Sequence, residues 1–248
     1  MSHSNPTTDS TMVRVAKFTV KGVGLLLVFG TIIFFLWRVF SSNNPKDLEK
    51  LTPNKPLHDA YVAAEAEGGG LSVLTQYQKD FITSDVEKNY GYFAVTDTKF
   101  IPDANQVQVL FRYNNSTIRH LVEDYALTEI PGRDERLYDV TLYIIYDLTP
   151  EDTSDNSVEH PDAIKAVRYH ASSETKATQN LYNFRKLVFD GVDLDSPMLV
   201  IYADFYYVGD LDYEKEAYGS LPLYFHDLAW DDYDLSKSER EAIENFGS

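Results

Sequence analysis

The longest apolar stretch of the chain covers residues 22–37 and contains no charged side chain. Val39 and Phe40 continue it beyond a single arginine, Arg38. At about 1.5 Å of rise per residue, a helix over residues 22–40 is about 28 Å long, close to the ~30 Å hydrocarbon core of a bilayer. The pattern therefore predicts one transmembrane helix at residues 22–40.

The residues before this stretch predict its orientation. Residues 1–12 are small, polar and aperiodic, and Arg14, Lys17 and Lys21 come directly before the apolar residues. Because basic residues tend to stay on the cytosolic side, the sequence predicts a disordered cytosolic tail at residues 1–21 and translocation of everything after the helix. This is the type II single-pass arrangement, in which the helix is an uncleaved signal-anchor.

A cleaved signal peptide is the alternative interpretation. Val39 and Ser41 fit the preference for small side chains before a cleavage site, which places the cut before Ser42. However, the apolar stretch is longer than the ~7–15 residues of an ordinary signal peptide, and Arg38 lies just before the site. We therefore favour the signal-anchor.

Residues 41–57 contain three prolines and many turn-forming residues. This composition predicts a stalk between the bilayer and the domain that follows. Residues 58–67 are rich in helix-forming side chains, and three glycines at 68–70 are expected to end that helix.

From residue 91 onward the dominant pattern has a period of two, which is typical of strands with one buried face. The strands predicted from it lie at 91–96, 106–114, 137–148, 181–189, 198–208 and 220–228. They do not alternate regularly with helices, so a parallel sheet is not expected. Residues 58–248 are therefore predicted to form one mainly-β domain, an antiparallel sandwich-like fold with a few short helices.

Two helices are expected among the later residues. In residues 117–125 apolar side chains recur on one helical face, and Ser116 or Thr117 is expected to cap the helix. Near the C-terminus, Ser236 and Glu239 have the spacing of a capping box and predict the start of a second helix.

The composition of the 248 residues narrows the possible chemistry. An aromatic content of 14% and a charged content of 25% allow a real hydrophobic core. The absence of cysteine excludes thiolate zinc sites, thiol catalysis, haem attachment through CxxCH and disulfides. Residues 190–248 hold fifteen Asp and Glu against three basic residues, which argues against nucleic acid or anionic lipid as a partner of this region. A basic partner or a divalent cation remains open.

Two overlapping N-glycosylation sequons begin at Asn114 and Asn115 and are completed by Ser116 and Thr117. If the domain is lumenal, we expect one of these asparagines to carry a glycan. The alternative is that the four residues form only a polar strand end followed by a helix cap.

Asp193 with Asp195, and Asp210 with Asp212, have the DxD spacing with which membrane-anchored transferases hold a divalent metal. Carboxylate oxygens suit Mg²⁺ or Mn²⁺. Against this interpretation, the alternation of strands and helices that a nucleotide-sugar fold needs is missing. The simpler interpretation is that these are turn aspartates at strand ends.

The acidic loops have a third interpretation, a Ca²⁺ site at one end of a sandwich. Its candidate ligands are the DxD aspartates and Asp190, with further aspartates near the C-terminus: Asp231, Asp232 and Asp234. The spacing does not match the EF-hand loop, so that type of site is rejected. Ca²⁺ or Mn²⁺ at these residues is the one cofactor that the sequence suggests.

No histidine lies in a metal-binding or hydrolase motif, and no other catalytic pattern stands out. We therefore expect a membrane-embedded, non-enzymatic protein of the endoplasmic reticulum, the Golgi or the cell surface. Its lumenal or extracellular β-rich domain is expected to serve as a binding or assembly module for a protein partner. The alternative function is a metal-dependent, membrane-anchored transferase that uses the DxD aspartates.

Overall fold

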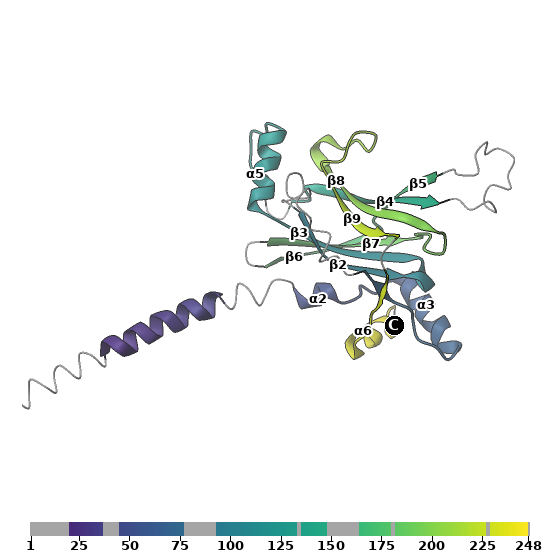
Figure 1. The fold of residues 1–248 in the computed structure, drawn as a ribbon, viewed down its shortest axis with the longest axis horizontal. Helices are drawn as coiled ribbons and strands as arrows, with labels where there is room; N and C mark the ends of the chain where they lie inside the picture. The colour runs from purple at the N-terminus through teal and green to yellow at the C-terminus, as the bar shows by residue number, and fades with distance from the viewer. Residues whose placement is uncertain are drawn as a thin grey trace, which may run out of the picture. The chain divides into compact units, whose positions relative to one another are not determined.

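A computed structural model of the chain describes residues 20–36, 45–76, 93–132, 135–147, 164–179, 182–226 and 229–247 (Figure 1). The chain divides into two compact units, Met1–Asn43 and Asn44–Ser248. The first unit contributes one described helix and the second contains all the described strands.

The helix of the first unit covers residues 20–36, and all its side chains are exposed. Leu26 is 74% exposed and Ile33 is 63% exposed. Within the described residues, no helix has both the length and the apolar character needed to cross a membrane. Of the predicted transmembrane stretch, residues 37–40 lie outside the described residues, as does most of the predicted tail.

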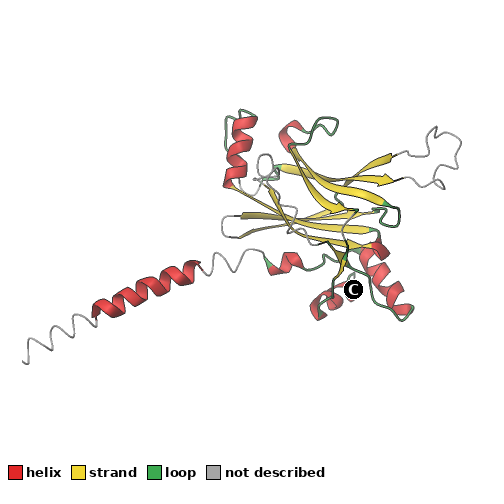
Figure 2. Ribbon diagram, in the orientation of Figure 1, coloured by secondary structure: helices red, strands yellow, loops and turns green. Residues whose placement is uncertain are grey.

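The second unit consists mainly of two antiparallel sheets, which confirms the predicted mainly-β fold (Figure 2). The larger sheet has six strands in the order β10 (Asp231–Asp232), β1 (Leu74–Thr75), β2 (Phe93–Ile101), β3 (Gln106–Asn114), β7 (Tyr182–Asp190) and β6 (Ser173–Gln179). The smaller sheet has four strands in the order β5 (Ile164–His170), β4 (Tyr138–Asp147), β8 (Met198–Tyr207) and β9 (Gly219–Phe225).

The two sheets pack face to face over one core. Along β4, Val140, Leu142 and Ile144 are buried in this core, as their period-two spacing predicts. Between the sheets, the rings of Phe93 and Phe205 stack with centroids 4.2 Å apart. Burial of such side chains removes apolar area from water, which is the main force that holds the sheets together.

The helices α2 (Lys46–Glu49), α3 (Lys55–Ala66) and α6 (Lys237–Glu244) lie on the outer side of the six-stranded sheet (Figure 2). Helices α3 and α6 form a second, smaller core there with Leu57, Tyr61 and Ile243. Leu48 of α2 packs separately against Leu110 and Phe184 of the sheet. The 3-10 turns η1 (Pro102–Ala104) and η2 (Val208–Asp210) follow β2 and β8.

The remaining helix, α5 (Asn115–Asp124), follows β3. The prediction of its cap was wrong, because Asn114 caps it rather than Ser116 or Thr117. Asn114 keeps an extended backbone, and its side-chain oxygen accepts the N–H groups of Ser116 (2.8 Å) and Thr117 (3.3 Å). At the C-terminus, the predicted capping box of Ser236 and Glu239 is present and begins α6.

Residues 45–57, within the segment predicted as a stalk, are part of the second unit. Leu48, Leu51 and Leu57 are buried there. Residues 41–44 of that segment lie outside the described residues. The described part of the segment is therefore packed into the domain rather than extended from it.

Candidate functional site

Asp190, the first of the predicted metal ligands, ends β7 and has hydrogen-bond donors on several sides. Its carboxylate accepts Nδ2 of Asn54 at 3.1 Å, Nε2 of Gln106 at 2.7 Å and Oγ of Ser172 at 2.6 Å. Three segments far apart in the sequence thus meet at one carboxylate. These contacts give Asp190 a structural role.

Asp193 closes a local turn. Its carboxylate accepts the backbone N–H groups of Asp195 (3.2 Å) and Ser196 (3.0 Å), and also the hydroxyl of Ser196 (2.7 Å). Burial alone would raise the pKa of Asp193, but these hydrogen bonds outweigh it and lower the pKa. Asp195 itself is exposed.

The second DxD pair lies beside a lysine. Nζ of Lys215 lies 3.2 Å from the carboxylate of Asp210 and 3.8 Å from that of Asp212. All three side chains are largely solvent-exposed. Solvent screening makes such exposed ion pairs weak.

The structure keeps the two DxD pairs apart, at opposite ends of β4. The hydroxyl of Tyr146 donates to the carbonyl of Asp193 at 3.1 Å, whereas Asp210 follows Tyr207, which pairs with Tyr138. Tyr138 and Tyr146 are eight positions apart along β4, a distance of about 27 Å. Within the described parts of the chain, no group of three or more His, Cys, Asp or Glu side chains is placed to hold a metal ion.

The two sequon asparagines differ in their surroundings. Asn114 is half-buried, and its side-chain oxygen is committed to the cap of α5. Asn115, the first residue of that helix, is exposed. Of the two, Asn115 has more room for a bulky glycan.

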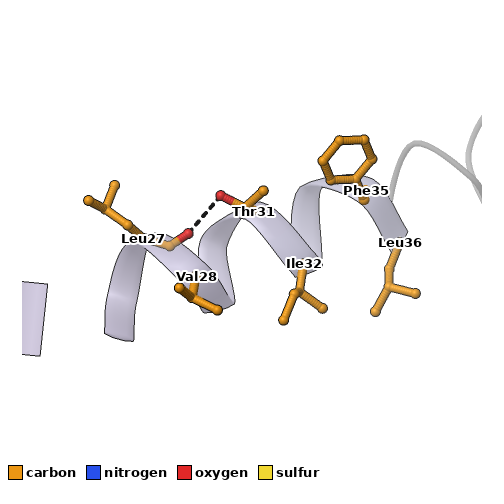
Figure 3. Close-up of a pocket in the computed structure, with 6 residues that line it drawn as sticks. All are labelled: Leu27, Val28, Thr31, Ile32, Phe35 and Leu36. Atoms are coloured by element: carbon orange, nitrogen blue, oxygen red, sulfur yellow. Dashed lines mark hydrogen bonds between the residues drawn. The ribbon is translucent and has the colours of Figure 1, made fainter. Parts of the chain in front are cut away.

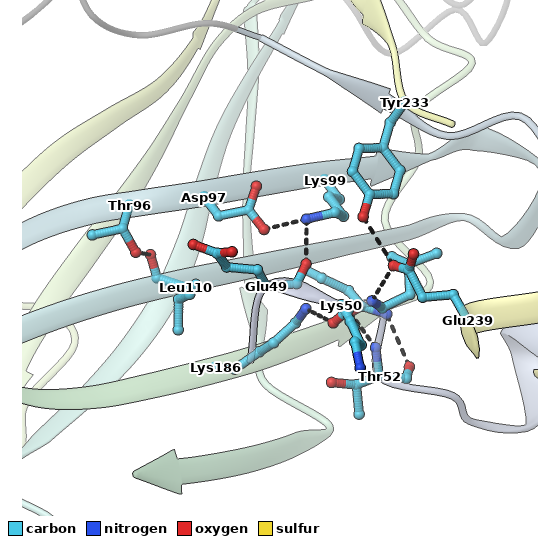
Figure 4. A network of polar contacts seen from close by, with 12 residues as sticks. Glu49, Lys50, Thr52, Thr96, Asp97, Lys99, Leu110, Lys186, Tyr233 and Glu239 are labelled. Carbon is cyan, nitrogen blue, oxygen red and sulfur yellow. Dashed lines mark hydrogen bonds and ion pairs between the residues drawn. The ribbon is translucent and has the colours of Figure 1, made fainter. Parts of the chain in front are cut away.

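A polar network on the outer face of the six-stranded sheet was not predicted (Figure 4). Here residues 45–54, which we call the strap, cross strands β2, β3 and β7. Beneath the strap, Lys99 of β2 and Lys186 of β7 are each only 2% exposed. Fully buried lysines are rare unless they are paired, so their partners define what the network does.

The two lysines hold the end of α2. Nζ of Lys99 donates to the carbonyl of Glu49 at 2.6 Å and also bonds Asp97, while Nζ of Lys186 donates to the carbonyl of Lys50. Carbonyls at a helix C-terminus lack partners within the helix and carry partial negative charge. Burial lowers the pKa of Lys186 to about 7, and repulsion from Lys99 adds to this effect.

The middle of the strap is fastened by two further contacts. The backbone N–H of Thr52 donates to Oε1 of Gln108 at 2.8 Å, and Nε2 of Gln108 donates to the carbonyl of Thr52 at 3.0 Å. The backbone N–H of Leu51 donates to Oε1 of Glu239 in α6 at 2.9 Å. The strap is therefore bound to the sheet and to the C-terminal helix together.

The outer face of the four-stranded sheet is the other unusual surface. The side chain of Arg168 on β5 lies among three tyrosines, with its guanidinium carbon 5.6 Å, 5.4 Å and 5.9 Å from the rings of Tyr143, Tyr206 and Tyr213. Its Nη1 donates to the carbonyl of Tyr213 at 2.6 Å. In the described residues, neither Nε of Arg168 nor Oγ1 of the buried Thr141 has a hydrogen-bond partner.

The helix at residues 20–36 carries a shallow apolar groove (Figure 3). Its lining residues are Leu27, Val28, Thr31, Ile32, Phe35 and Leu36. The one polar side chain, Thr31, donates its hydroxyl to the carbonyl of Leu27 at 2.7 Å. The helix therefore satisfies that hydroxyl internally and leaves the groove apolar.

Comparisons of the chain with known protein families, with curated proteins and with solved structures find no match.

Proposed function

We propose that the chain is a single-pass membrane protein whose β-rich domain serves as a binding or assembly module for a protein partner. In this proposal the N-terminus is cytosolic and the domain lies in a lumen or outside the cell. The observation that carries the proposal is the helix at residues 20–36, whose apolar side chains are exposed along its whole length.

The chemistry of this helix supports a bilayer environment. Exposed Leu, Ile and Phe side chains are unfavourable in water, and burying one of them gains about 1.5–3 kcal/mol. The hydroxyl of Thr31 is already satisfied by the backbone, so inserting it into lipid leaves no unpaired donor. In the sequence the apolar run continues to Phe40, and three basic residues precede it.

The strap supports an anchored domain. Only eight residues, 37–44, separate the helix from Pro45, where the strap begins. From there the chain is held by two buried lysines, a glutamine and a C-terminal glutamate. The chain from Pro45 onward is therefore part of the folded domain.

The outer face of the four-stranded sheet supports the binding part of the proposal. No described α-helix lies over it, although the loop that carries Tyr213 packs against part of it, whereas α2, α3 and α6 cover the outer face of the other sheet (Figure 1). Tyrosine and arginine, which are prominent on this face, are the residue types enriched at binding hot spots. The alternative, a metal-dependent transferase that uses the DxD aspartates, draws less support, because the carboxylate of Asp193 is bonded within its own turn and those of Asp210 and Asp212 lie beside Lys215.

Alkaline carbonate extraction of membranes that contain the full-length chain tests the anchor. We expect the chain to stay in the membrane pellet, and a variant with both Val28→Lys and Ile32→Lys to move to the soluble fraction. A matched control places the same charge on exposed apolar residues of the domain, Val62→Lys and Leu211→Lys, and should stay in the pellet.

Two results would overturn the proposal. One is release of the native chain by carbonate, since a peripheral protein is released under these conditions. The other is retention of the double-lysine variant to the same extent as the native chain, which would show that the helix is not what holds the protein on the membrane.

A further inference from the structure

The domain exposes apolar side chains on two loops. Val208 is 40% exposed and Leu211 is 45% exposed, and both lie in the loop that joins β8 to β9, residues 208–218. Ile130, which is 76% exposed, lies in the loop that follows α5, residues 125–132. In the part of the domain that the structure describes, the other exposed large apolar side chains are Val62, Ile164 and Phe246.

Aromatic rings join the two loops at one end of the domain, where Figure 1 shows α5 and the loop after β8. The ring of Tyr125 lies 4.5 Å from that of Tyr207 and 5.8 Å from that of Tyr218, centroid to centroid. The hydroxyl of Tyr218 donates to Asp124 at 2.7 Å. All three tyrosines are half-buried, so part of each one reaches solvent. We call the two loops, Tyr207 and the last two residues of α5 the end patch.

Carboxylates surround the apolar side chains of the end patch. Burial raises the pKa of Tyr125, and the negative charges of Asp210 and Asp124 raise it further, so carboxylates from both loops act on the same ring. The end patch has a net charge of −6, with Lys215 as its one basic residue against seven acidic ones: Glu123, Asp124, Glu129, Asp210, Asp212, Glu214 and Glu216.

This combination of apolar and acidic side chains limits what can bind. An apolar centre with a polar rim is the usual composition of a protein interface. The negative charge repels nucleic acid and anionic lipid, and it repels a second copy of the chain, because a symmetric pair would bring the same carboxylates together. A protein segment with basic side chains is attracted instead, and its lysines or arginines can also lie over tyrosine rings.

The end patch borders the outer face of the four-stranded sheet. Nη1 of Arg168 on that face donates to the carbonyl of Tyr213 at 2.6 Å. The hydroxyl of Tyr213 donates to Asp139 of β4 at 2.5 Å. These bonds fasten the loop between β8 and β9 to the edge of the face, so a partner that lies on the face can reach the end patch as well.

We propose that the end patch binds a segment of a protein partner that carries both basic and apolar side chains. The apolar side chains of this segment pack on Val208, Leu211 and the tyrosine rings, and its basic side chains pair with the carboxylates around them. The inference rests on the binding part of the proposed function and not on the membrane anchor. It adds the chemistry of the partner.

Fluorescence anisotropy with labelled peptides tests the inference. The full-length chain is held in nanodiscs of zwitterionic lipid, and empty nanodiscs give the background. The probe is a short peptide of lysine, leucine and serine. A second peptide has glutamate in place of lysine, and a third has serine in place of leucine. We expect the probe to bind, and the other two peptides to bind at least about tenfold more weakly.

Substitutions in the end patch should weaken binding of the probe. We expect about a tenfold loss for the double variant Asp210→Asn with Asp212→Asn, and a similar loss for Leu211→Ser. Asparagine keeps the side-chain oxygen that accepts a backbone N–H in this loop. The control is Asp231→Asn with Asp232→Asn, which removes the same charge from exposed residues of the other sheet and should change the affinity by less than about twofold.

Three results would overturn the inference. The first is that the probe binds no more tightly than the glutamate peptide. The second is that the two pairs of aspartate substitutions weaken binding equally, which would show attraction to the net charge alone. The third is unchanged binding in Leu211→Ser.

Two further measurements distinguish this failure from failure of the proposed function. Tyr202→Ala changes the outer face of the four-stranded sheet. If it abolishes binding of the probe and the end-patch variants do not, the inference is wrong and the outer face is the binding surface. Carbonate extraction of the same variants tests the anchor separately, because none of the substitutions touches residues 20–36.

Discussion

The backbone N–H of Leu51 donates a 2.9 Å hydrogen bond to Oε1 of Glu239, a residue 188 positions later in the chain. The bond joins the strap to the C-terminal helix. Glu239 also accepts the hydroxyl of Tyr233 at 2.9 Å and the N–H of Ser236 at 2.9 Å. One buried carboxylate therefore holds two ends of the domain together.

Replacing this carboxylate should destabilise the domain. Glu239→Ala leaves the N–H of Leu51 buried without an acceptor and removes the capping box of α6. We expect a loss of about 3 kcal/mol in the free energy of unfolding, measured by urea denaturation. Glu241→Ala, an exposed position on the same helix, is the control and should stay within about 0.5 kcal/mol of the native chain. Equal stability of the two variants would contradict the role of Glu239.

Lys186 should make stability depend on pH in the alkaline range. Its pKa is about 7 in the folded chain against 10.5 when unfolded, so the unfolded state binds more protons between these values. The free energy of unfolding should therefore rise with pH from about 7 to 10.5, by up to about 1.4 kcal/mol per pH unit. Below about pH 7 both states are protonated and this contribution is constant.

The variant Lys186→Met should remove that slope. The measurement is urea denaturation at several pH values from 7 to 9.5, and the quantity of interest is the difference in slope between variant and native chain. Lys237→Met changes a lysine whose side chain is 90% exposed and should keep the native slope. If the native chain and Lys186→Met have the same slope, Lys186 is not buried with a lowered pKa.

Substitutions of the aspartates predicted as metal ligands should differ in their effect on the stability of the domain. Asp190→Ala removes the acceptor for Asn54, Gln106 and Ser172 and should cost about 2 kcal/mol of stability. Asp195→Ala, on an exposed loop, should change stability by less than about 0.5 kcal/mol. Both are measured with and without Ca²⁺ or Mn²⁺. A metal-dependent rise in the unfolding midpoint that Asp195→Ala abolishes would instead support a metal site.

A glycan, if the domain is translocated, should be attached at Asn115. Its side chain is exposed, whereas the side-chain oxygen of Asn114 caps α5. In a glycosylating host, endoglycosidase should increase the electrophoretic mobility of the native chain and of Asn114→Gln but not that of Asn115→Gln. Each substitution leaves the other sequon intact, so the reverse pattern would assign the glycan to Asn114.

The sequence predicted the strands with a buried face, including β9 at a sheet edge, and missed the largely exposed strands β5 and β6. β4 was predictable because Tyr138, Val140 and Leu142 alternate with polar residues. β6 was missed because its residues are almost all polar and exposed, so no period-two signal exists. Since β5 was missed too, Arg168 had no predicted neighbours, and its cluster with three tyrosines could not be assembled from the sequence.

The strap was hidden for a different reason. Its prolines and turn formers are typical of a stalk, and the groups that hold it down lie far away in the sequence. The side chain of Lys186 donates to the carbonyl of Lys50, 136 residues earlier. Every residue has a backbone carbonyl, so the sequence does not indicate which one a lysine bonds. The DxD spacings, by contrast, can be read directly from the sequence. The first of them forms a turn, as the hydrogen bonds that Asp193 accepts from Ser196 show.

Protease protection in sealed microsomes tests the central claim, an anchored chain with a translocated domain, most directly. The full-length chain with a C-terminal tag is treated with protease before and after detergent permeabilisation. We predict that the tagged domain is protected until detergent is added and that only the residues before the helix are removed. Loss of the tagged domain in intact microsomes would contradict the account, because it would place residues 45–248 in the cytosol.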